Sequence, residues 1–347
     1  MGLFDVFRGI FRTDYYEKMP MSVQLQWNRT KKKRLLVIAA WTLVVLIILL
    51  ILGAFVSYKG PLLRSSESSD RHAVFTTLYS NSFALGAAVL GHSVRRANVN
   101  AKLVLLYLDD NRVSPQALCI TEAAGWENHA VSLIPPPHDG DGIDNRFSDQ
   151  YTKLRIWSVG EVLGYDRAVY LDADTLVRRN FDELFDIPWE FGATTDVYLD
   201  ERKFAITFNA GVLAFKPSMR TFDDMVSKLE TTDFPRKEAE QAFLNVYYRT
   251  NMVRLPYAYN ANVATKYTDG DMWNELKETM KVIHYTLVKP FWEPSVANDN
   301  LTTPDQIREI NDAHGAGGWW REEVGWWRES FEDLMKQKGA IIQACYR

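Results

Sequence analysis

The stretch Arg167-Ala168-Val169-Tyr170-Leu171-Asp172-Ala173-Asp174-Thr175-Leu176-Val177 decides the fold. A run of strand-forming residues ends at Leu171, and two aspartates follow, separated by a single alanine. Ligands of open α/β sheets bind at the carboxyl ends of the strands. Two carboxylates there form a site of hard oxygen ligands, which suits Mg²⁺ or Mn²⁺. The alternative is a strand-end aspartate that caps the next turn.

Strand and helix patterns alternate on both sides of this stretch. The expected strands are 72–79, 102–108, 130–134, 167–171, 191–195, 209–215 and 282–285. Helical patterns cover 83–94, 116–124, 151–163, 181–185, 218–229 and 236–248. This alternation predicts an α/β fold with a mixed, mostly parallel sheet and helices on both faces.

Composition places the chain among globular proteins. It has 347 residues, a net charge of -4 and only two cysteines, Cys119 and Cys345. The charge gives no sign of a nucleic-acid partner, and two cysteines do not form a disulfide framework. Cys119 lies in an apolar, helix-like stretch, so we expect a buried free thiol there; a single disulfide is the alternative.

The N-terminal part has the pattern of a membrane anchor. Residues 1–34 end in Lys31-Lys32-Lys33-Arg34, and about 22 uncharged residues, 35–56, follow. At about 1.5 Å per residue this length crosses a bilayer core. Because the basic cluster precedes the span, residues 1–34 are expected in the cytosol and the body in the lumen. Residues 57–70 read as a stem, and a buried core helix is the alternative for the span.

Two tryptophan pairs mark the C-terminal segment, 316–347. Trp319-Trp320 and Trp326-Trp327 are seven residues apart, which places both pairs on one face of a helix. We expect this helix to pack on the main domain, 71–315. A surface that lies on a membrane or stacks on sugars is the alternative.

A metal bound by two carboxylates needs further ligands, and His284 at the end of a short strand is the best candidate. An imidazole can complete a Mn²⁺ site, whereas Mg²⁺ prefers oxygen. The alternative is a structural histidine. Asp109-Asp110 is a rival carboxylate pair, but it lacks the intervening residue, and a solvated turn is expected there.

Several further residues suit an anionic, phosphate-bearing ligand. Lys289 can neutralise diphosphate charge. Asn209 and Gly211 fit a ligand that approaches the backbone closely, since glycine leaves room. Lys153, one helix before the aspartates, can reach the sugar or its phosphate. The alternatives are solvated lysines at 153 and 289 and an ordinary strand entry at 209–211.

The order of these segments resembles glycosyltransferase family 8, the glycogenin-like group. The resemblance covers about residues 72–292, and the segments that carry it are 75–94, Tyr151-Thr152-Lys153-Leu154, Tyr170-Leu171-Asp172-Ala173-Asp174, Asn180-Phe181-Asp182-Glu183-Leu184-Phe185, Phe208-Asn209-Ala210-Gly211-Val212, Glu240-Gln241-Ala242-Phe243, 255–260 and His284-Tyr285-Thr286-Leu287-Val288-Lys289-Pro290-Phe291.

The resemblance implies a GT-A fold, a UDP-sugar donor, a Mn²⁺ ion and retention of anomeric configuration. It implies Asp172, Asp174 and His284 as metal ligands and Lys289 as the diphosphate-binding lysine. It places uridine contacts at Thr77, Tyr79 and Phe83, and donor-sugar contacts at Lys153, Asn209, Gly211 and Gln241. Glu240 or Gln241 would support the ion-like sugar, and Asn260 is a weaker match on the acceptor side.

This sequence departs from the family pattern at three places. Glu240 stands where the family usually has aspartate. Thr286 replaces a glycine near the diphosphate. The first strand offers Ser80-Asn81 instead of an Asn-Asp pair.

The expected function is that of a Golgi type II membrane enzyme that moves a hexose or N-acetylhexosamine from a UDP-sugar to a glycan or glycoconjugate in the lumen. One alternative is a cytosolic, self-glucosylating glycogenin-type primer, which the anchor argues against. The other is a membrane-tethered protein that binds sugar nucleotides or glycans without catalysis. The departures from the family pattern at Glu240 and Thr286 favour this alternative.

Overall fold

The computed structural model describes residues 20–22, 38, 41–46, 71–294 and 300–347. The chain divides into two compact units, Met1–Ser65 and Ser66–Arg347. Most of the expected tail and anchor and the whole expected stem lie outside the described residues. Within the described part, no helix combines the length and the apolar character that crossing a bilayer requires.

The second unit is built on a seven-stranded sheet in the order β3-β2-β1-β4-β7-β6-β8. Neighbouring strands run parallel except β7, which is antiparallel to both β4 and β6. The mixed, mostly parallel sheet is therefore confirmed. Its strands are β1 His72–Leu78, β2 Lys102–Leu108, β3 Glu127–Val131, β4 Arg167–Leu171, β6 Phe191–Val197, β7 Phe204–Phe215 and β8 Val253–Leu255.

A second sheet of three short strands has the order β5-β10-β9. It consists of β5 Thr175–Val177, β10 Val282–His284 and β9 Ala261–Asn262. β10 runs antiparallel to β5 and parallel to β9. Because β5 follows β4 after only three residues, this small sheet begins at the carboxyl end of β4.

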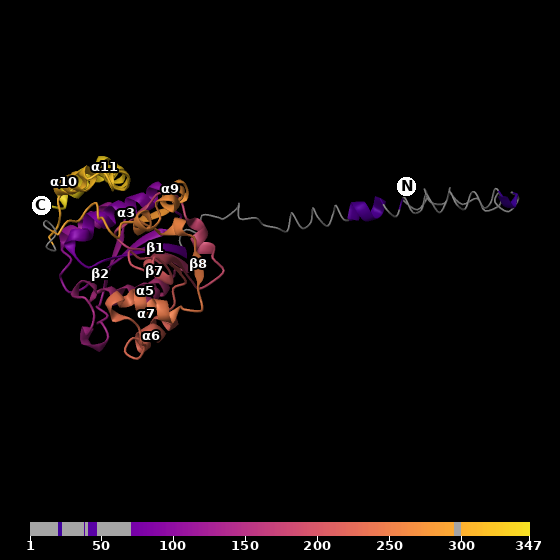
Figure 1. Ribbon diagram of the computed structural model, residues 1–347, viewed down its shortest axis with the longest axis horizontal. Coiled ribbons are helices and arrows are strands. Elements are labelled where there is room, and N and C mark those ends of the chain that lie inside the picture. The colour runs from indigo at the N-terminus through magenta and orange to yellow at the C-terminus, as the bar shows by residue number, and fades with distance from the viewer. Residues whose placement is uncertain (1–19, 23–37, 39–40, 47–70, 295–299) are drawn as a thin grey trace, which may run out of the picture. The chain divides into compact units, whose positions relative to one another are not determined.

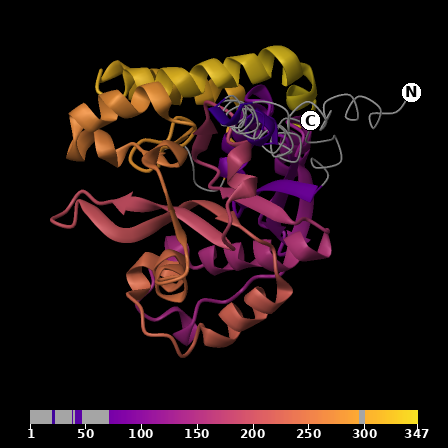
Figure 2. The ribbon, with the colours of Figure 1, turned by 90° about the vertical axis from the view of Figure 1, so that its right-hand side faces the viewer.

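Helices cover both faces of the large sheet, as Figures 1 and 2 show for α3, α10 and α11 on one side and α5, α6 and α7 on the other. The α-helices of this unit are α3 Ala84–Arg96, α4 Pro115–Ala123, α5 Arg155–Val162, α6 Met219–Lys228, α7 Ala239–Tyr247, α8 Ala264–Thr268, α9 Gly270–Thr279, α10 Pro304–Ala316 and α11 Arg321–Ala344. Among the 3₁₀ turns are η4 Asn81–Phe83, η7 Gln150–Leu154, η8 Asp182–Asp186, η9 Arg236–Glu238 and η10 Tyr257–Tyr259.

Each face of the sheet has its own apolar core. On β4, Val169 and Leu171 pack into the core under α3 and α11, whereas Ala168 and Tyr170 pack into the core over α5 to α7. All four residues are at most 1% exposed. This two-sided burial explains why the strand reads as a continuous apolar run and not as an alternating one.

Two of the expected strands begin earlier than the sequence indicated. β3 begins at Glu127, three residues before the expected start, because it pairs with the long strand β2 in the register Val104 to Glu127. β7 begins at Phe204 and forms an antiparallel hairpin with β6. The sequence pattern indicated only the apolar, buried half of β7, from Asn209.

The C-terminal segment packs on the main domain, as expected, but the two tryptophan pairs do not share a helix face. α11 begins at Arg321, so Trp319 and Trp320 lie in the turn before it. Trp327 is fully buried, whereas Trp319 is 49% exposed. The helix breaks here because Gly317 and Gly318 precede the pair, and Gly318 has a φ of +79°.

The expected free thiol at Cys119 is wrong. Cys119 in α4 forms a disulfide with Cys345, with the two Cα atoms 5.7 Å apart and a sequence separation of 226. Cys345 directly follows α11, so the bond joins the C-terminal helix to α4. The disulfide was only the alternative in the sequence analysis, because the two cysteines lie at distant positions that only the packing of α11 brings together.

We expect the double variant Cys119→Ser/Cys345→Ser to lose about 2–4 kcal/mol of unfolding free energy, since the bond closes a very long loop in the unfolded chain. Denaturant unfolding of the oxidised and reduced protein measures the loss. Reductant should have no effect on the double variant. Identical unfolding midpoints of the oxidised and reduced wild type would contradict the prediction.

Candidate active site

Asp172 and Asp174 lie in the turn between β4 and β5. The backbone N–H of Asp172 donates to the carbonyl of Gly211 on β7 at 2.8 Å. The carbonyl of Asp172 accepts bonds from the N–H and the hydroxyl of Thr175, at 3.0 and 2.8 Å. The Asp172 carbonyl, and not its carboxylate, therefore closes the turn, and both carboxylates stay at the carboxyl end of β4.

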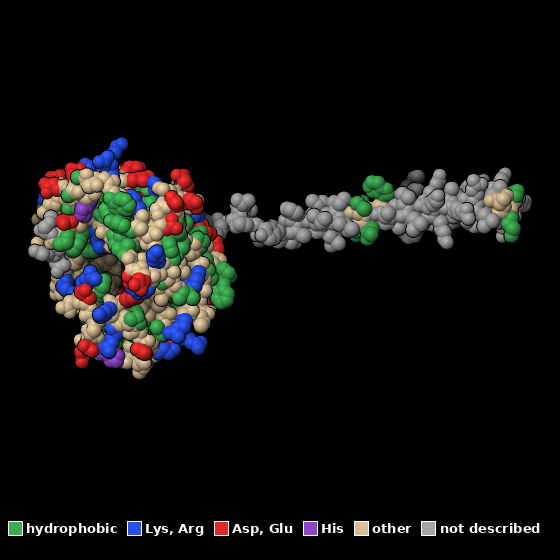
Figure 3. All heavy atoms as spheres, in the orientation of Figure 1, with side chains coloured by type: hydrophobic (Ala, Val, Ile, Leu, Met, Phe, Trp, Pro, Cys, Tyr) green, Lys and Arg blue, Asp and Glu red, His purple; other side chains and the backbone are tan. Residues whose placement is uncertain are grey.

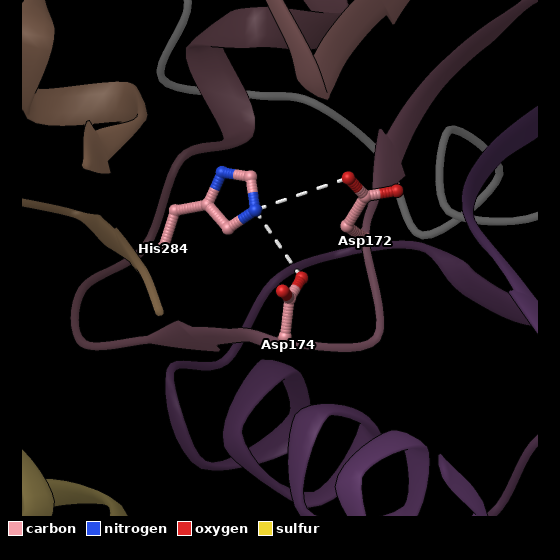
Figure 4. A group of neighbouring side chains, drawn as sticks. All are labelled: Asp172, Asp174 and His284. Carbon is pink, nitrogen blue, oxygen red and sulfur yellow. Dashed lines mark ion pairs between the residues drawn. The ribbon is translucent and has the colours of Figure 1, made fainter. Parts of the chain in front are cut away.

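Strand pairing brings His284 to the two aspartates. β10 lies antiparallel to β5 with His284 opposite Thr175, and the N–H of Tyr285 donates to the carbonyl of Asp174 at 2.9 Å. His284 Nε2 lies 3.2 Å from Asp174 Oδ1 and 3.8 Å from Asp172 Oδ2 (Figure 4). One ligand atom from each residue lies within 4.8 Å of the others. The structure thus brings together the three expected metal ligands.

Asn260 fixes the orientation of the imidazole. Its Oδ1 lies 3.1 Å from His284 Nδ1, on the side of the ring away from the aspartates. An amide oxygen can only accept, so the Nδ1–H donates to Asn260, and Nε2 is the ring nitrogen that faces the carboxylates. The sequence placed Asn260 on the acceptor side; the structure gives it a supporting contact to His284.

We expect Asn260→Ala to weaken Mn²⁺ binding by roughly 10–100-fold, the usual effect of removing the partner of a metal-binding histidine. Titration calorimetry of the purified chain with MnCl₂ measures the change. Asn251→Ala is the matched control, since Asn251 is an exposed asparagine outside this network. Equal affinities of Asn260→Ala and wild type would rule out this role.

Lys289 forms an ion pair with Asp174 and also donates to the carbonyl of Tyr285 at 3.4 Å. Burial raises the pKa of Asp174, but Lys289 and His284 outweigh burial and hold this pKa well below its usual range. Asp174 is therefore ionised at any ordinary pH. The alternative of a solvated lysine does not fit, because the ammonium group of Lys289 bonds to a buried carboxylate.

Lys153 is a buried lysine, which contradicts the alternative of a solvated one. It is 2% exposed, and its Nζ lies 2.7 Å from Glu240 Oε1 and 3.2 Å from Asp172 Oδ1. Burial disfavours the charged lysine, but Asp172 and Glu240 outweigh it, and the pKa of Lys153 lies above its usual value. Burial raises the pKa of Glu240, although Lys153 opposes this shift.

The Glu240 departure has a structural consequence. α7 follows η9 through Ala239, whose φ of +48° lies in the left-handed region. Glu240 in the first turn of α7 is 5% exposed and reaches Lys153, so the longer side chain is held in an ion pair. Thr286 likewise has a partner, Asn262 Oδ1 at 2.6 Å.

A chain of amides and one carboxylate links the three candidate ligands Asp172, Asp174 and His284, called the metal cluster below, to α7. Asn260 Nδ2 donates to Asn209 Oδ1 at 3.0 Å, and Asn209 Nδ2 donates to Asp196 Oδ1 at 3.2 Å. Gln241 Nε2 donates to Asp196 Oδ2 at 2.9 Å, and Gln241 Oε1 accepts from the N–H of Ala210 at 2.9 Å. The expected contacts Asn209 and Gln241 thus meet at Asp196.

Asp196 is the site residue that the sequence reasoning missed. It is 4% exposed, and burial raises its pKa. It lies on β6 one residue beyond the expected strand 191–195, in no recognisable motif. The only signal for it was an aspartate at the end of an apolar strand.

Gly211 is needed to leave room for His284, and the expected close approach of a ligand stays a prediction. A Cβ on Gly211 would lie 2.2 Å from His284 Cε1 and 2.9 Å from Asn209 Oδ1. The ring of His284 therefore occupies the space that glycine leaves, and β7 can pass behind the metal cluster only without a side chain here.

Of the three expected uridine contacts, Thr77 and Tyr79 lie at the polar network and Phe83 lies outside it. Thr77 Oγ1 lies 2.9 Å from the hydroxyl of Tyr170, which donates to Asp172 at 2.6 Å. Burial raises the pKa of Tyr79, whereas the charge of Lys153 lowers it and only partly offsets burial. Phe83 in η4 packs edge-on against Phe291, with ring centroids 5.2 Å apart, and belongs to no part of the polar network described above.

The rival pair Asp109-Asp110 forms a solvated turn, as expected. Arg112 Nε pairs with Asp110 at 2.7 Å, and Arg112 also pairs with Asp149 at 2.7 Å. Both aspartates of the pair are exposed. Among the residues that the structure describes, neither joins a metal-binding group.

The donor set fits a divalent cation. Two carboxylates and one neutral imidazole nitrogen suit Mn²⁺ better than Mg²⁺. The second carboxylate oxygen of Asp174 is held by Lys289, and Asp172 is held by Tyr170. Every ligand thus has a supporting contact, as bound-metal sites require. Charged side chains also gather around a hollow on the face shown in Figure 3.

Comparison with known families gives a match that includes all three ligands. The profile of glycosyl transferase family 8 matches residues 75–294, which is more than half of the chain. Inositol phosphorylceramide glucuronosyltransferase 1 of Arabidopsis thaliana is 32% identical over 65% of this chain. Glycogenin-2 of Homo sapiens is 34% identical over 75% of this chain. The matches span 43% and 54% of these relatives, so this chain corresponds to about half of each.

Among solved structures, the glycosyltransferase GlyE of Streptococcus pneumoniae TIGR4 is similar. It shares 18% identity with this chain, with a TM-score of 0.48 and coverage of 77% of this chain and 64% of that one.

Proposed function

We propose, because this chain belongs to glycosyl transferase family 8, that it transfers a hexose or N-acetylhexosamine from a UDP-sugar to a glycan or glycoconjugate. The proposed reaction depends on Mn²⁺ and retains the anomeric configuration, on a GT-A-type fold. The observation that carries the proposal is the Asp172–Asp174–His284 cluster at the carboxyl end of β4. A nucleotide diphosphate needs a divalent cation at such a site.

Asp172, Asp174 and His284 would hold the ion, and Mn²⁺ would stabilise negative charge on the departing diphosphate. Lys289 supports the same charge. Its ammonium group already lies on the Asp174 carboxylate, where a diphosphate would be bound. Asn260 keeps Nε2 of His284 directed at the two aspartates.

The donor sugar is proposed to lie between the metal cluster and α7. Asn209, Gln241 and Asp196 form a hydrogen-bonded group there, with amides and a carboxylate that suit sugar hydroxyls. Lys153 and Glu240 lie next to it. Their charges offset each other, so Glu240 can stay ionised beside a sugar that develops positive charge.

We also propose that the protein is a Golgi type II membrane enzyme with the second unit in the lumen and residues 35–56 as its anchor. The Cys119–Cys345 disulfide supports this compartment, because such bonds persist in oxidising environments and are rare in the cytosol. This observation also speaks against the cytosolic primer. Glycosylation of the sequon at Asn300, an exposed residue, tests the location. The proposed location would be overturned if glycosidase left the protein unchanged and if protease added to sealed vesicles digested the second unit.

The test of the activity is a donor screen with the full chain purified in detergent. UDP-glucose, UDP-galactose, UDP-N-acetylglucosamine and UDP-glucuronate are incubated with Mn²⁺, and UDP release is measured. We expect turnover of one donor, lost with EDTA and in Asp174→Asn. Asp110→Asn, at an exposed aspartate outside the cluster, should keep it. Binding of UDP and Mn²⁺ without turnover of any donor would favour the non-catalytic alternative.

A further inference from the structure

Two exposed aromatic rings and a third, half-buried one form a group far from the expected donor contacts in sequence. We call Tyr267, Trp319 and Trp320 the aromatic platform. Tyr267 and Trp319 are 57% and 49% exposed. Their ring centroids lie 5.1 Å apart with planes at 32°, and Trp320 stands edge-on to Tyr267 at 5.5 Å. Large aromatic side chains of this kind are normally buried, so their joint exposure calls for a reason.

The platform is held in place by a buried charge. Glu323 is fully buried, and both of its carboxylate oxygens accept from Lys266 Nζ at 2.8 Å. Lys266 also donates to the carbonyl of Trp319 at 2.5 Å, and its Nζ lies 5.3 Å from the ring centroids of Trp319 and Trp320. Trp273 Nε1 gives Glu323 a further bond at 2.9 Å.

This arrangement fixes a segment that the sequence would leave flexible. Trp319 follows two glycines, and such a turn has many accessible conformations. Lys266 removes that freedom at the Trp319 carbonyl, at the expense of burying a carboxylate. Pre-organised aromatic rings lose little entropy when a ligand binds, and this is the advantage of presenting them rigidly.

The platform belongs to the same substructure as the metal cluster. Tyr267 lies in α8, which begins two residues after β9, and β9 pairs with the strand that carries His284. On the other side, the hydroxyl of Tyr285, next to His284, donates to the carbonyl of Glu323 at 2.8 Å. The small sheet therefore connects the rings with the proposed catalytic site.

The chemistry of the platform favours a saccharide over a membrane surface. The electron-rich face of an aromatic ring attracts the slightly positive C–H groups on the face of a pyranose. Membrane-surface segments combine Trp, Phe and Leu side chains with an excess of Lys and Arg on the polar face, so the charge around the rings is what separates the two ligands. Here the lysine that lies beside the rings, Lys266, is paired with Glu323 at 2.8 Å and leaves no net charge.

We propose that the aromatic platform is a second carbohydrate site, where successive pyranose rings of a glycan stack on Trp319 and Tyr267. It rests on the proposed function only in that the bound glycan is the acceptor of the transferase. The platform holds the chain of sugars, and the metal cluster acts on the donor.

The test measures binding of neutral linear hexasaccharides to the full chain by titration calorimetry, with maltohexaose, cellohexaose and xylohexaose as probes. We expect at least one to bind the wild type, and Trp319→Ala and Tyr267→Ala each to weaken its binding about tenfold, which corresponds to about 1.4 kcal/mol. Trp189→Ala is the matched control: Trp189 is a 51% exposed tryptophan before β6 and should bind as the wild type does. Melting temperatures of all variants check that they fold.

Two outcomes would overturn the proposal: no hexasaccharide binds the wild type, or Trp319→Ala and Tyr267→Ala bind it with unchanged affinity. Vesicles of phosphatidylcholine and phosphatidylserine form a second arm. Vesicle binding that depends on Trp319, without saccharide binding, would also overturn it and assign the platform to a membrane. Wild-type UDP release from each donor is measured in parallel, so failure of the transferase proposal is seen separately.

Discussion

Gly211→Ala is expected to lose Mn²⁺ binding by more than about 100-fold, since a change that only disturbs a ligand's orientation already costs roughly 10–100-fold. The added Cβ would lie 2.2 Å from Cε1 and 2.6 Å from Nδ1 of His284, and real contacts of this kind are not observed. The clash falls on the ring itself, which Asn260 and strand pairing hold in place, so His284 has to leave the cluster. UDP release should fall with metal binding.

The experiment separates this effect from a general loss of stability. Gly325→Ala adds the same methyl group at an exposed position of α11, where a Cβ meets nothing within 4 Å, and it should keep Mn²⁺ affinity and UDP release. Calorimetry with MnCl₂ and thermal unfolding are measured on both variants. A Gly211→Ala protein that binds Mn²⁺ as the wild type does would show that His284 is not a ligand.

The sequence predicted the parts of this site that are local in the chain. The apolar run before Asp172 and the single residue before Asp174 fix both carboxylates at a strand end, because strand burial and turn geometry act over a few residues. His284 was found because it ends a short strand and lies close to Lys289 in sequence.

The parts that the sequence could not predict depend on pairing between distant segments. The antiparallel entry of β7 brings Gly211 behind His284, and no local pattern indicates strand direction. The environment of Lys153 is set by Glu240, 87 residues later, so sequence alone gave a solvated lysine as the alternative. Asp196 and the Cys119–Cys345 bond were missed for the same reason.

Lys153→Met is expected to lower the unfolding free energy by about 3–5 kcal/mol, because it leaves the buried carboxylate of Glu240 without its counter-charge. Glu240 is 5% exposed and lies 2.7 Å from Lys153, and Asp172 lies 3.2 Å from it. Denaturant unfolding measures the loss. Lys228→Met is the control: Lys228 pairs with Asp224 at 2.7 Å on the surface and should change stability by less than about 0.5 kcal/mol.

The pH dependence of this loss has a definite sign. Burial already raises the pKa of Glu240 in the folded protein, and Lys153 opposes that shift. Without Lys153 the folded-state pKa rises further above the unfolded one, so the penalty is present when Glu240 is ionised and shrinks as falling pH protonates it. Lys153→Met should therefore be closer to wild-type stability at pH 5 than at pH 8. A loss that is independent of pH would mean that lost packing, and not the unpaired charge, causes it.

The double variant Lys153→Met/Glu240→Gln tests the same ion pair at a single pH. Glu240→Gln alone keeps Lys153 beside Asp172, so its loss should be smaller than that of Lys153→Met. In the double variant the carboxylate that Lys153→Met leaves unpaired is gone, and the protein should retain about 1–3 kcal/mol more stability than the two single losses added together allow. Additive losses would mean that Lys153 and Glu240 stabilise the fold independently, each through its own remaining contacts, and that the buried pair beside Asp172 has no energetic coupling to preserve.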